Sequence, residues 1–188
     1  MIENPYGISI HFIDNSMVIT AWLDNQTYQI TTQDAYSELI PQLQKFNLHN
    51  LQWIKVLRGP GSFSSIKVVL ATAQALRLAL PHIKILGVTL NEIIRSIKNY
   101  ESVPIVLKLN TTIWYVFETE WKIYHYSSLV NLKSCTTPHF NELNKITKAE
   151  YISWPNISEG IKNAKGSDDL SPLYLYLSSE EILNNMNK

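Results

Sequence analysis

The sequence has a single cysteine, no net charge and only six glycines among its 188 residues. One thiol, Cys135, can form neither an internal disulfide nor a cysteine-based zinc cluster, so nothing in the chain requires an oxidising compartment. Sixteen Lys and Arg residues balance sixteen Asp and Glu residues, which leaves no overall field to attract a polyanion such as RNA. We therefore expect no nucleic-acid binding by the chain alone.

Long apolar runs are absent as well. The longest ones are interrupted by Lys, Arg or Gly well before they could cross a bilayer, and the chain does not open with a basic start followed by an apolar segment. The 45% content of hydrophobic residues is still enough to form the core of one domain or of two small lobes. These features predict a cytoplasmic, globular protein without a membrane segment.

The first half of the chain carries the clearest secondary-structure signals. Three β-rich runs, at 6–14, 16–24 and 26–32, are separated by turns and predict a three-stranded meander. An amphipathic helix follows, with Thr31 or Thr32 as its expected cap, and then "LQWIKVL" and "IKILGV" predict two buried strands, each followed by a helix. Thr89 is the expected cap of the last of these helices. The order β-β-β-α-β-α-β-α predicts an α/β fold with a mixed sheet flanked by helices.

The second half is less regular. "VPIVLKL", "TIWYVFET" and "WKIYHYSS" predict three more strands, which would start a second, smaller sheet lobe. We place the boundary near residues 100–104, so that a first lobe spans 1–102 and a reduced second lobe spans 103–188. The C-terminal segment of the second lobe is expected to return to the first lobe. Residues 132–170 predict only short helices, and "DLSPLYLYL" predicts an extended segment.

The loop Gly59, Pro60, Gly61, Ser62 and Phe63 joins an apolar strand to a long helix. Its pattern is not a Walker A loop, because the only nearby lysine, Lys67, falls inside the helix, and it lacks the third glycine of a dinucleotide fingerprint. Two interpretations remain, a capped strand-to-helix turn and an anion-binding nest at the helix N-terminus. We expect Gly61 to adopt a positive φ.

The helix behind this loop has little polar surface. Its apolar side chains form two ridges: Ala71, Ala75 and Ala79, and Val69, Ala73, Leu76 and Leu80. A helix that is apolar nearly all round must be covered nearly all round. The sequence leaves open whether the surplus apolar face belongs to the core or contacts another protein.

Residues 58–93, "RGPGSFSSIKVVLATAQALRLALPHIKILGVTLNEI", resemble the signature of the bacterial TsaB (YeaZ) family, which reads GPGSFTGLR, then an alanine-rich helix with A-x-G-L-A, a proline and G-V-S-x-L-E. Weaker similarities extend to both ends of the chain. "FIDNS" is similar to the family's I-D-T-S opening, "ELIPQLQ" to its L-L-P helix, and "SPLYLYL" to its C-terminal P-x-Y-L-R element.

The resemblance implies an actin- and hexokinase-like (ribonuclease H-like) fold of two lobes. It also implies a role without catalysis or cofactor, as scaffold partner of the TsaD-type transferase that forms N6-threonylcarbamoyladenosine at position 37 of tRNA. A TsaE-like ATPase would join this assembly, and tRNA would bind only through the complex. The family's dimer face implies an interface, with TsaD or with a second copy in isolation, formed by Leu39, Leu43, Val69, Ala73 and Leu76.

Several positions depart from the family pattern. Ala35 or Tyr36 stands where the family has histidine before its L-L-P helix, and "KLNTT" stands where it has Asp-Ala-Arg. The glycine-poor second half predicts a reduced second lobe with a poor nucleotide cleft.

Two enzymatic alternatives remain. A sugar-kinase-like enzyme that binds or hydrolyses ATP would use Asp14, and a glycoprotease-like hydrolase would use Ser62 or Ser64. The five histidines are isolated in the sequence, which predicts no metal site.

Overall fold

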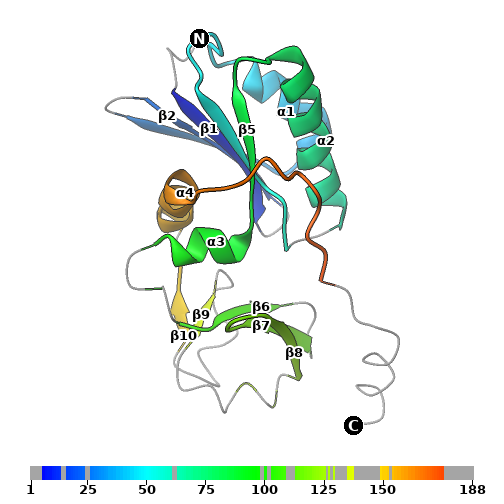
Figure 1. Cartoon of the computed structure of the whole chain (residues 1–188), viewed down its shortest axis with the longest axis vertical. Coiled ribbons are helices and arrows are strands. Elements are labelled where there is room, and N and C mark those ends of the chain that lie inside the picture. Colours follow the sequence, from blue (N-terminus) through cyan, green and yellow to red (C-terminus); the bar gives the residue numbers. More distant parts are fainter. Residues whose placement is uncertain are drawn as a thin grey trace. The chain divides into compact units, whose positions relative to one another are not determined.

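A computed structural model gives the arrangement of helices and strands (Figure 1). In chain order the elements are β1 Gly7–Ile13, β2 Ser16–Trp22, β3 Thr27–Thr32, α1 Ala35–Leu43, β4 Trp53–Leu57, α2 Phe63–Ala79, β5 Lys84–Val88, α3 Leu90–Arg95, β6 Ile105–Lys108, β7 Ile113–Phe117, β8 Trp121–His125, β9 Cys135–Thr137, β10 Ala149–Tyr151 and α4 Trp154–Asn163. The structure describes residues 6–13, 16–23, 26–60, 63–97, 100, 103–108, 113–125, 127, 129, 135–137, 149–152 and 154–175.

The described residues divide into two compact units. Unit 1 contains those up to Ile93 together with Ser158–Tyr174, and unit 2 contains the others. The division therefore lies earlier in the chain than the predicted boundary near residues 100–104. The reason is Arg95 at the end of α3, whose guanidinium donates hydrogen bonds to three backbone carbonyls of unit 2, those of Tyr100, Val103 and Glu118.

The sheet of unit 1 has five strands in the order β3-β2-β1-β4-β5. β1, β2 and β3 pair antiparallel, as the predicted meander requires. β4 pairs parallel with both β1 and β5, so the sheet is mixed. Because parallel neighbours need a crossover connection, α1 and α2 are each placed between two strands along the chain and lie on one side of the sheet (Figure 1).

The two faces of this sheet are covered by different helices. Side chains alternate along a strand, so Ile8 and Ile10 of β1 point into an apolar core with α1 and α2. The opposite face contacts the part of α4 that belongs to unit 1. There the hydroxyls of Thr20 and Ser158 lie 3.2 Å apart, and the Lys55 ammonium donates to the carbonyls of Lys162 and Ala164 at 2.6 Å each.

The helix ends of unit 1 follow capping chemistry. Asp34 caps α1, because its carboxylate accepts a hydrogen bond from the Ser37 N–H at 3.2 Å. The predicted cap at Thr31 or Thr32 is therefore wrong; the Thr32 hydroxyl accepts from the Asp34 N–H instead. Thr89 precedes α3 as predicted, and its N–H and hydroxyl both donate to the Glu92 carboxylate at 2.7 Å.

Unit 2 contains a second five-stranded sheet, with strands in the order β10-β9-β6-β7-β8. β6, β7 and β8 pair antiparallel and correspond to the three predicted strands. The short parallel pair of β9 and β10 was not expected from the sequence. Among the described helices, none combines the length and hydropathy that a membrane crossing requires.

Candidate functional site

The loop between β4 and α2 lies at the carboxyl end of the parallel strands of unit 1. Gly59 has a φ of 129°, a conformation that disfavours other residues, and the Gly59–Pro60 peptide bond is cis. A Cβ atom at Gly59 would overlap the carbonyl oxygen of Leu173, so this position needs glycine for space as well. Both Gly59 and Pro60 are buried, whereas Phe63 at the start of α2 is half-exposed. Gly61 and Ser62 lie outside the described residues, and the expected positive φ of Gly61 stays a prediction.

A segment from the C-terminal part of the chain crosses the ends of β4 and β5. We call residues 166–173 the strap. Gly87 of β5 exchanges two backbone hydrogen bonds with Ser167, at 2.7 and 2.9 Å, and the Leu173 N–H donates to the Arg58 carbonyl at 2.7 Å. A Cβ atom at Gly87 would overlap the Asp169 carbonyl oxygen. The strap therefore depends on two glycines that are distant from it in the sequence, Gly59 in the loop after β4 and Gly87 in β5.

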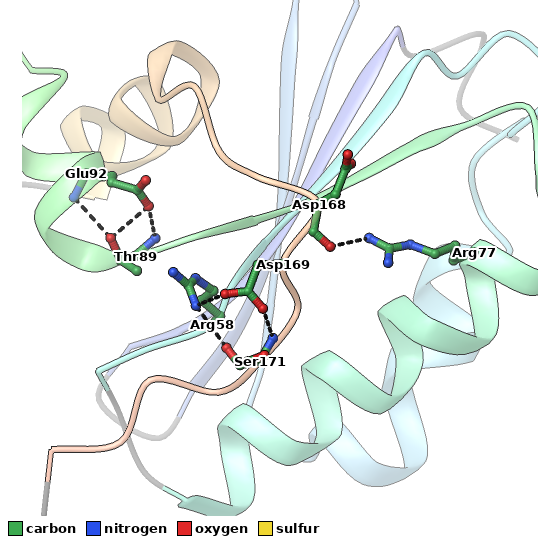
Figure 2. A network of polar contacts seen from close by, with 7 residues as sticks. All are labelled: Arg58, Arg77, Thr89, Glu92, Asp168, Asp169 and Ser171. Carbon is green, nitrogen blue, oxygen red and sulfur yellow. Dashed lines mark hydrogen bonds and ion pairs between the residues drawn. The ribbon is translucent and has the colours of Figure 1, made fainter.

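Two arginines hold the strap from the side of unit 1 (Figure 2). Arg58 donates to the Asp169 carboxylate at 2.8 Å and to the Ser171 carbonyl at 3.1 Å. Arg77 of α2 reaches the carbonyls of Ile85 and Asp168. Hydrogen bonds from the Ser171 hydroxyl and N–H, together with the Arg58 charge, lower the pKa of Asp169.

The polar groups of the strap network bind one another, as expected for contacts that hold the fold together. The Arg58 head group, which directly follows the carboxyl end of β4, is engaged by Asp169 and Ser171. Glu92 is bound by Thr89 at the start of α3 (Figure 2). Among the described residues no three His, Cys, Asp or Glu side chains gather as metal ligands. Asp14 and Ser62, on which the enzymatic alternatives rest, lie outside the described residues.

The structure corrects the residues predicted for the interface. Leu39, Leu43, Val69 and Ala73 are at most 3% exposed and belong to the core between the sheet and the two helices, where Leu76 also packs. These four are covered by the chain itself and are not available to a partner, whereas Leu76 is only partly buried and stays a predicted interface residue. Helical spacing showed two apolar ridges on α2, and the ridge through Val69 and Ala73 is the one that faces the sheet.

The other ridge of α2 faces outward. Its exposed side chains include Ala71, Gln74, Ala75 and Leu78, which we call the outer face of α2. Leu78 is 85% exposed, and Ile40 on the neighbouring helix α1 is 52% exposed. Small side chains beside a fully exposed leucine form a surface on which the backbone of another helix can approach closely.

Sequence reasoning missed the strap contacts. Arg58 and Asp169 are 111 positions apart, and no local pattern links them. The one available signal was Gly87 inside a strand, because glycine there often marks a close approach of another backbone.

The fold is that of two solved structures. YeaZ from Pseudomonas aeruginosa matches with a TM-score of 0.63 and 12% sequence identity, over 90% of this chain and 99% of that chain. An uncharacterized protein with similarity to peptidase YEAZ, also from Pseudomonas aeruginosa, matches with a TM-score of 0.60 and 11% identity, over 92% of this chain and 99% of that one. No protein-family model and no curated protein sequence matches the chain.

Proposed function

We propose that the chain is a TsaB-type protein of the YeaZ fold and acts in the cytoplasm as a non-catalytic scaffold. Its partner would be a TsaD-type transferase that forms N6-threonylcarbamoyladenosine at position 37 of tRNA, with a TsaE-like ATPase joining the complex. The observation that carries the proposal is the likeness of fold to YeaZ over 90% of the chain. The "GPGSF" loop and the helix that follows it support the same assignment from the sequence.

The proposal assigns the partner contact to the outer face of α2. Four of the five residues first named for the interface are buried, so we assign a helix–helix contact to the exposed side of α2 with Ala71, Ala75 and Leu78. The same face would pair two copies of the chain in isolation. A neutral protein with a balanced charge would meet tRNA only through its partners.

Co-purification with a TsaD-type protein tests the proposal. Leu78→Arg and Ala75→Arg would bring a charge into a desolvated contact, and we expect at least a tenfold loss of binding together with loss of tRNA modification. Gln52→Arg, which adds the same charge at an exposed site outside α2, is the matched control and should bind normally. Full binding by both α2 variants would contradict this interface, and absence of any complex with the wild-type chain would contradict the function.

Turnover by the isolated chain would favour the enzymatic alternatives. The purified protein should hydrolyse neither ATP nor a peptide substrate. If it does, and if Asp14→Ala or Ser62→Ala abolishes the activity, the scaffold proposal is wrong.

A further inference from the structure

Polar side chains lie on the face of the sheet that α4 covers. Ser9 of β1 pairs with Thr20 of β2 on one side and with Lys55 of β4 on the other. All three side chains are buried, and both Thr20 and Lys55 contact α4 directly, through Ser158 and through the carbonyls at the end of the helix. The sheet therefore meets this helix through a polar row that lies among buried apolar side chains such as Val18 and Trp22.

His11 extends this polar row along β1. It lies two residues beyond Ser9 and so points to the same side of the sheet, where it is a diagonal neighbour of Thr20. Its side chain is fully buried, and neither Nδ1 nor Nε2 has a hydrogen-bond partner among the described residues. Burial lowers the pKa of His11 to about 3. The imidazole is therefore neutral at pH 7, because burial disfavours its charged form.

In the part of unit 1 that the structure describes, the charged groups on this side of the sheet do not compensate a positive charge on His11. β2 carries no charged residue, and β4 carries only Lys55, a second cation. On α4, Glu159 is exposed to solvent, and the Lys162 ammonium lies over the Tyr6 ring. Glu92 of α3 is already bound by Thr89. A protonated His11 would be an unpaired buried cation near another cation, which is costly in a protein interior.

We propose that His11 is an acid-sensitive latch: its protonation releases residues 158–164 of the α4 segment from the sheet, while α1, α2 and the strands stay folded. Release lets water reach His11 and Lys55 together. The apolar core on the other face of the sheet shares none of these polar contacts, so it keeps the strands assembled.

The strap should stay in place during this release. Its carboxylate, Asp169, has a lowered pKa and is held by Arg58 and Ser171, so mild acid leaves the ion pair charged. Once residues 158–164 are free, the short helix that contains them lacks tertiary support, and an isolated helix of this length is marginal in water. Its amides then lose protection. The strap and α4 thus differ in their response to acid, although they are consecutive in the chain.

Native-state hydrogen exchange at pH 7.5 and pH 5.0 tests the latch, with each rate corrected for the intrinsic exchange rate at that pH. The Ala164 amide, which is bonded to Gly160, reports α4, and the Ser167 amide, which is bonded to Gly87, reports the strap. The pKa of His11 is about 3 when α4 is closed, and we take the ordinary value of 6.5 when α4 is open. These two values predict an opening constant that is about 30-fold larger at pH 5.0 than at pH 7.5. We expect this increase at Ala164 and less than a threefold change at Ser167.

His11→Phe removes the titrating group and should leave the opening constant at Ala164 the same at both pH values. His11→Gln, which is also neutral throughout, serves the same purpose if the phenylalanine variant does not fold. Equal increases at Ala164 and Ser167, or an Ala164 opening constant that equals that of the β2 amides at both pH values, would mean that α4 opens only together with the strap or with the whole protein, and either result would overturn the proposal. So would an unchanged Ala164 in the wild type, or a His11→Phe protein with the full 30-fold response.

Discussion

The two faces of the unit 1 sheet are covered by helices in different ways. Toward α1 and α2, strand β1 presents Ile8 and Ile10 to an apolar core, whereas toward α4 the same strand presents Ser9 and His11. Apolar burial is non-directional and stabilises in proportion to area, while hydrogen bonds to α4 fix its position at a small net gain. The comparison indicates that the first face is held by apolar packing, whereas the second combines buried apolar side chains with directional hydrogen bonds that fix the position of α4.

The largest effect should come from a charge on the apolar face. Ala73 is fully buried between α2 and the sheet, so Ala73→Arg should cost more than about 4 kcal/mol or prevent folding. Leu78→Arg on the same helix, at an 85% exposed position, should change stability by less than about 0.5 kcal/mol. Urea unfolding of the two variants measures the contrast. A stable Ala73→Arg protein would show that this side of α2 does not pack on the sheet.

A smaller loss is expected when the cation under α4 is removed. Lys55→Met keeps most of the buried stem but takes away the donor of the two 2.6 Å hydrogen bonds to the carbonyls of Lys162 and Ala164. We expect a loss of about 2 kcal/mol, the usual scale for hydrogen bonds to a charged group. Thermal or urea unfolding at neutral pH provides the measurement. Wild-type stability of this variant would mean that the ammonium does not hold α4.

Acid should reduce stability by a similar amount through His11. Its pKa is about 3 in the native state and near 6.5 when unfolded, so between these values the unfolded chain binds more protons and stability falls as pH falls. Between pH 7.5 and pH 5.0 the wild type should lose about 2 kcal/mol more than His11→Phe. Urea titrations of both proteins at the two pH values give this difference, and parallel losses would assign the acid effect to other groups.

The smallest effect concerns the hydroxyl pair. Thr20→Val and Ser158→Ala each remove one partner of the 3.2 Å contact, and the double variant removes both. A double-mutant cycle should give a coupling energy of about 1 kcal/mol. A coupling near zero would mean that the two hydroxyls act independently, and α4 would then depend on Lys55 and on its apolar side chains.

Much of the fold could be predicted from the sequence because the signals are local. The alternating runs of β1 to β3 and the apolar strands β4 and β5 lie where their periodicity indicated. The sequence predicted that a polar side chain caps α1 but not which one, because Asp34 and Thr32 lie in the same turn and either can accept a backbone hydrogen bond. The short strands β9 and β10 have too few residues for a periodic signal.

The candidate site was harder to predict because its contacts are non-local. Both ridges of α2 are apolar, so spacing alone did not indicate that Val69 and Ala73 face the sheet and that Ala71 and Ala75 face outward. The hydrogen bond from Arg58 to Asp169 joins distant parts of the chain, and the sequence around neither residue indicates it. His11 alternates with apolar neighbours in the way a surface residue does, and its complete burial follows only from the fold.

The strap also has a consequence for the order in which the protein forms on the ribosome. Strands β1 to β5 are synthesised first. The backbone groups of Gly87 and Arg58 have no strap partner until Ser167 and Leu173 have left the exit tunnel. All of unit 2 up to Ile157 is translated in the interval. The nascent first unit is therefore an incompletely bonded sheet until the strap has been synthesised, and only then can these hydrogen bonds form.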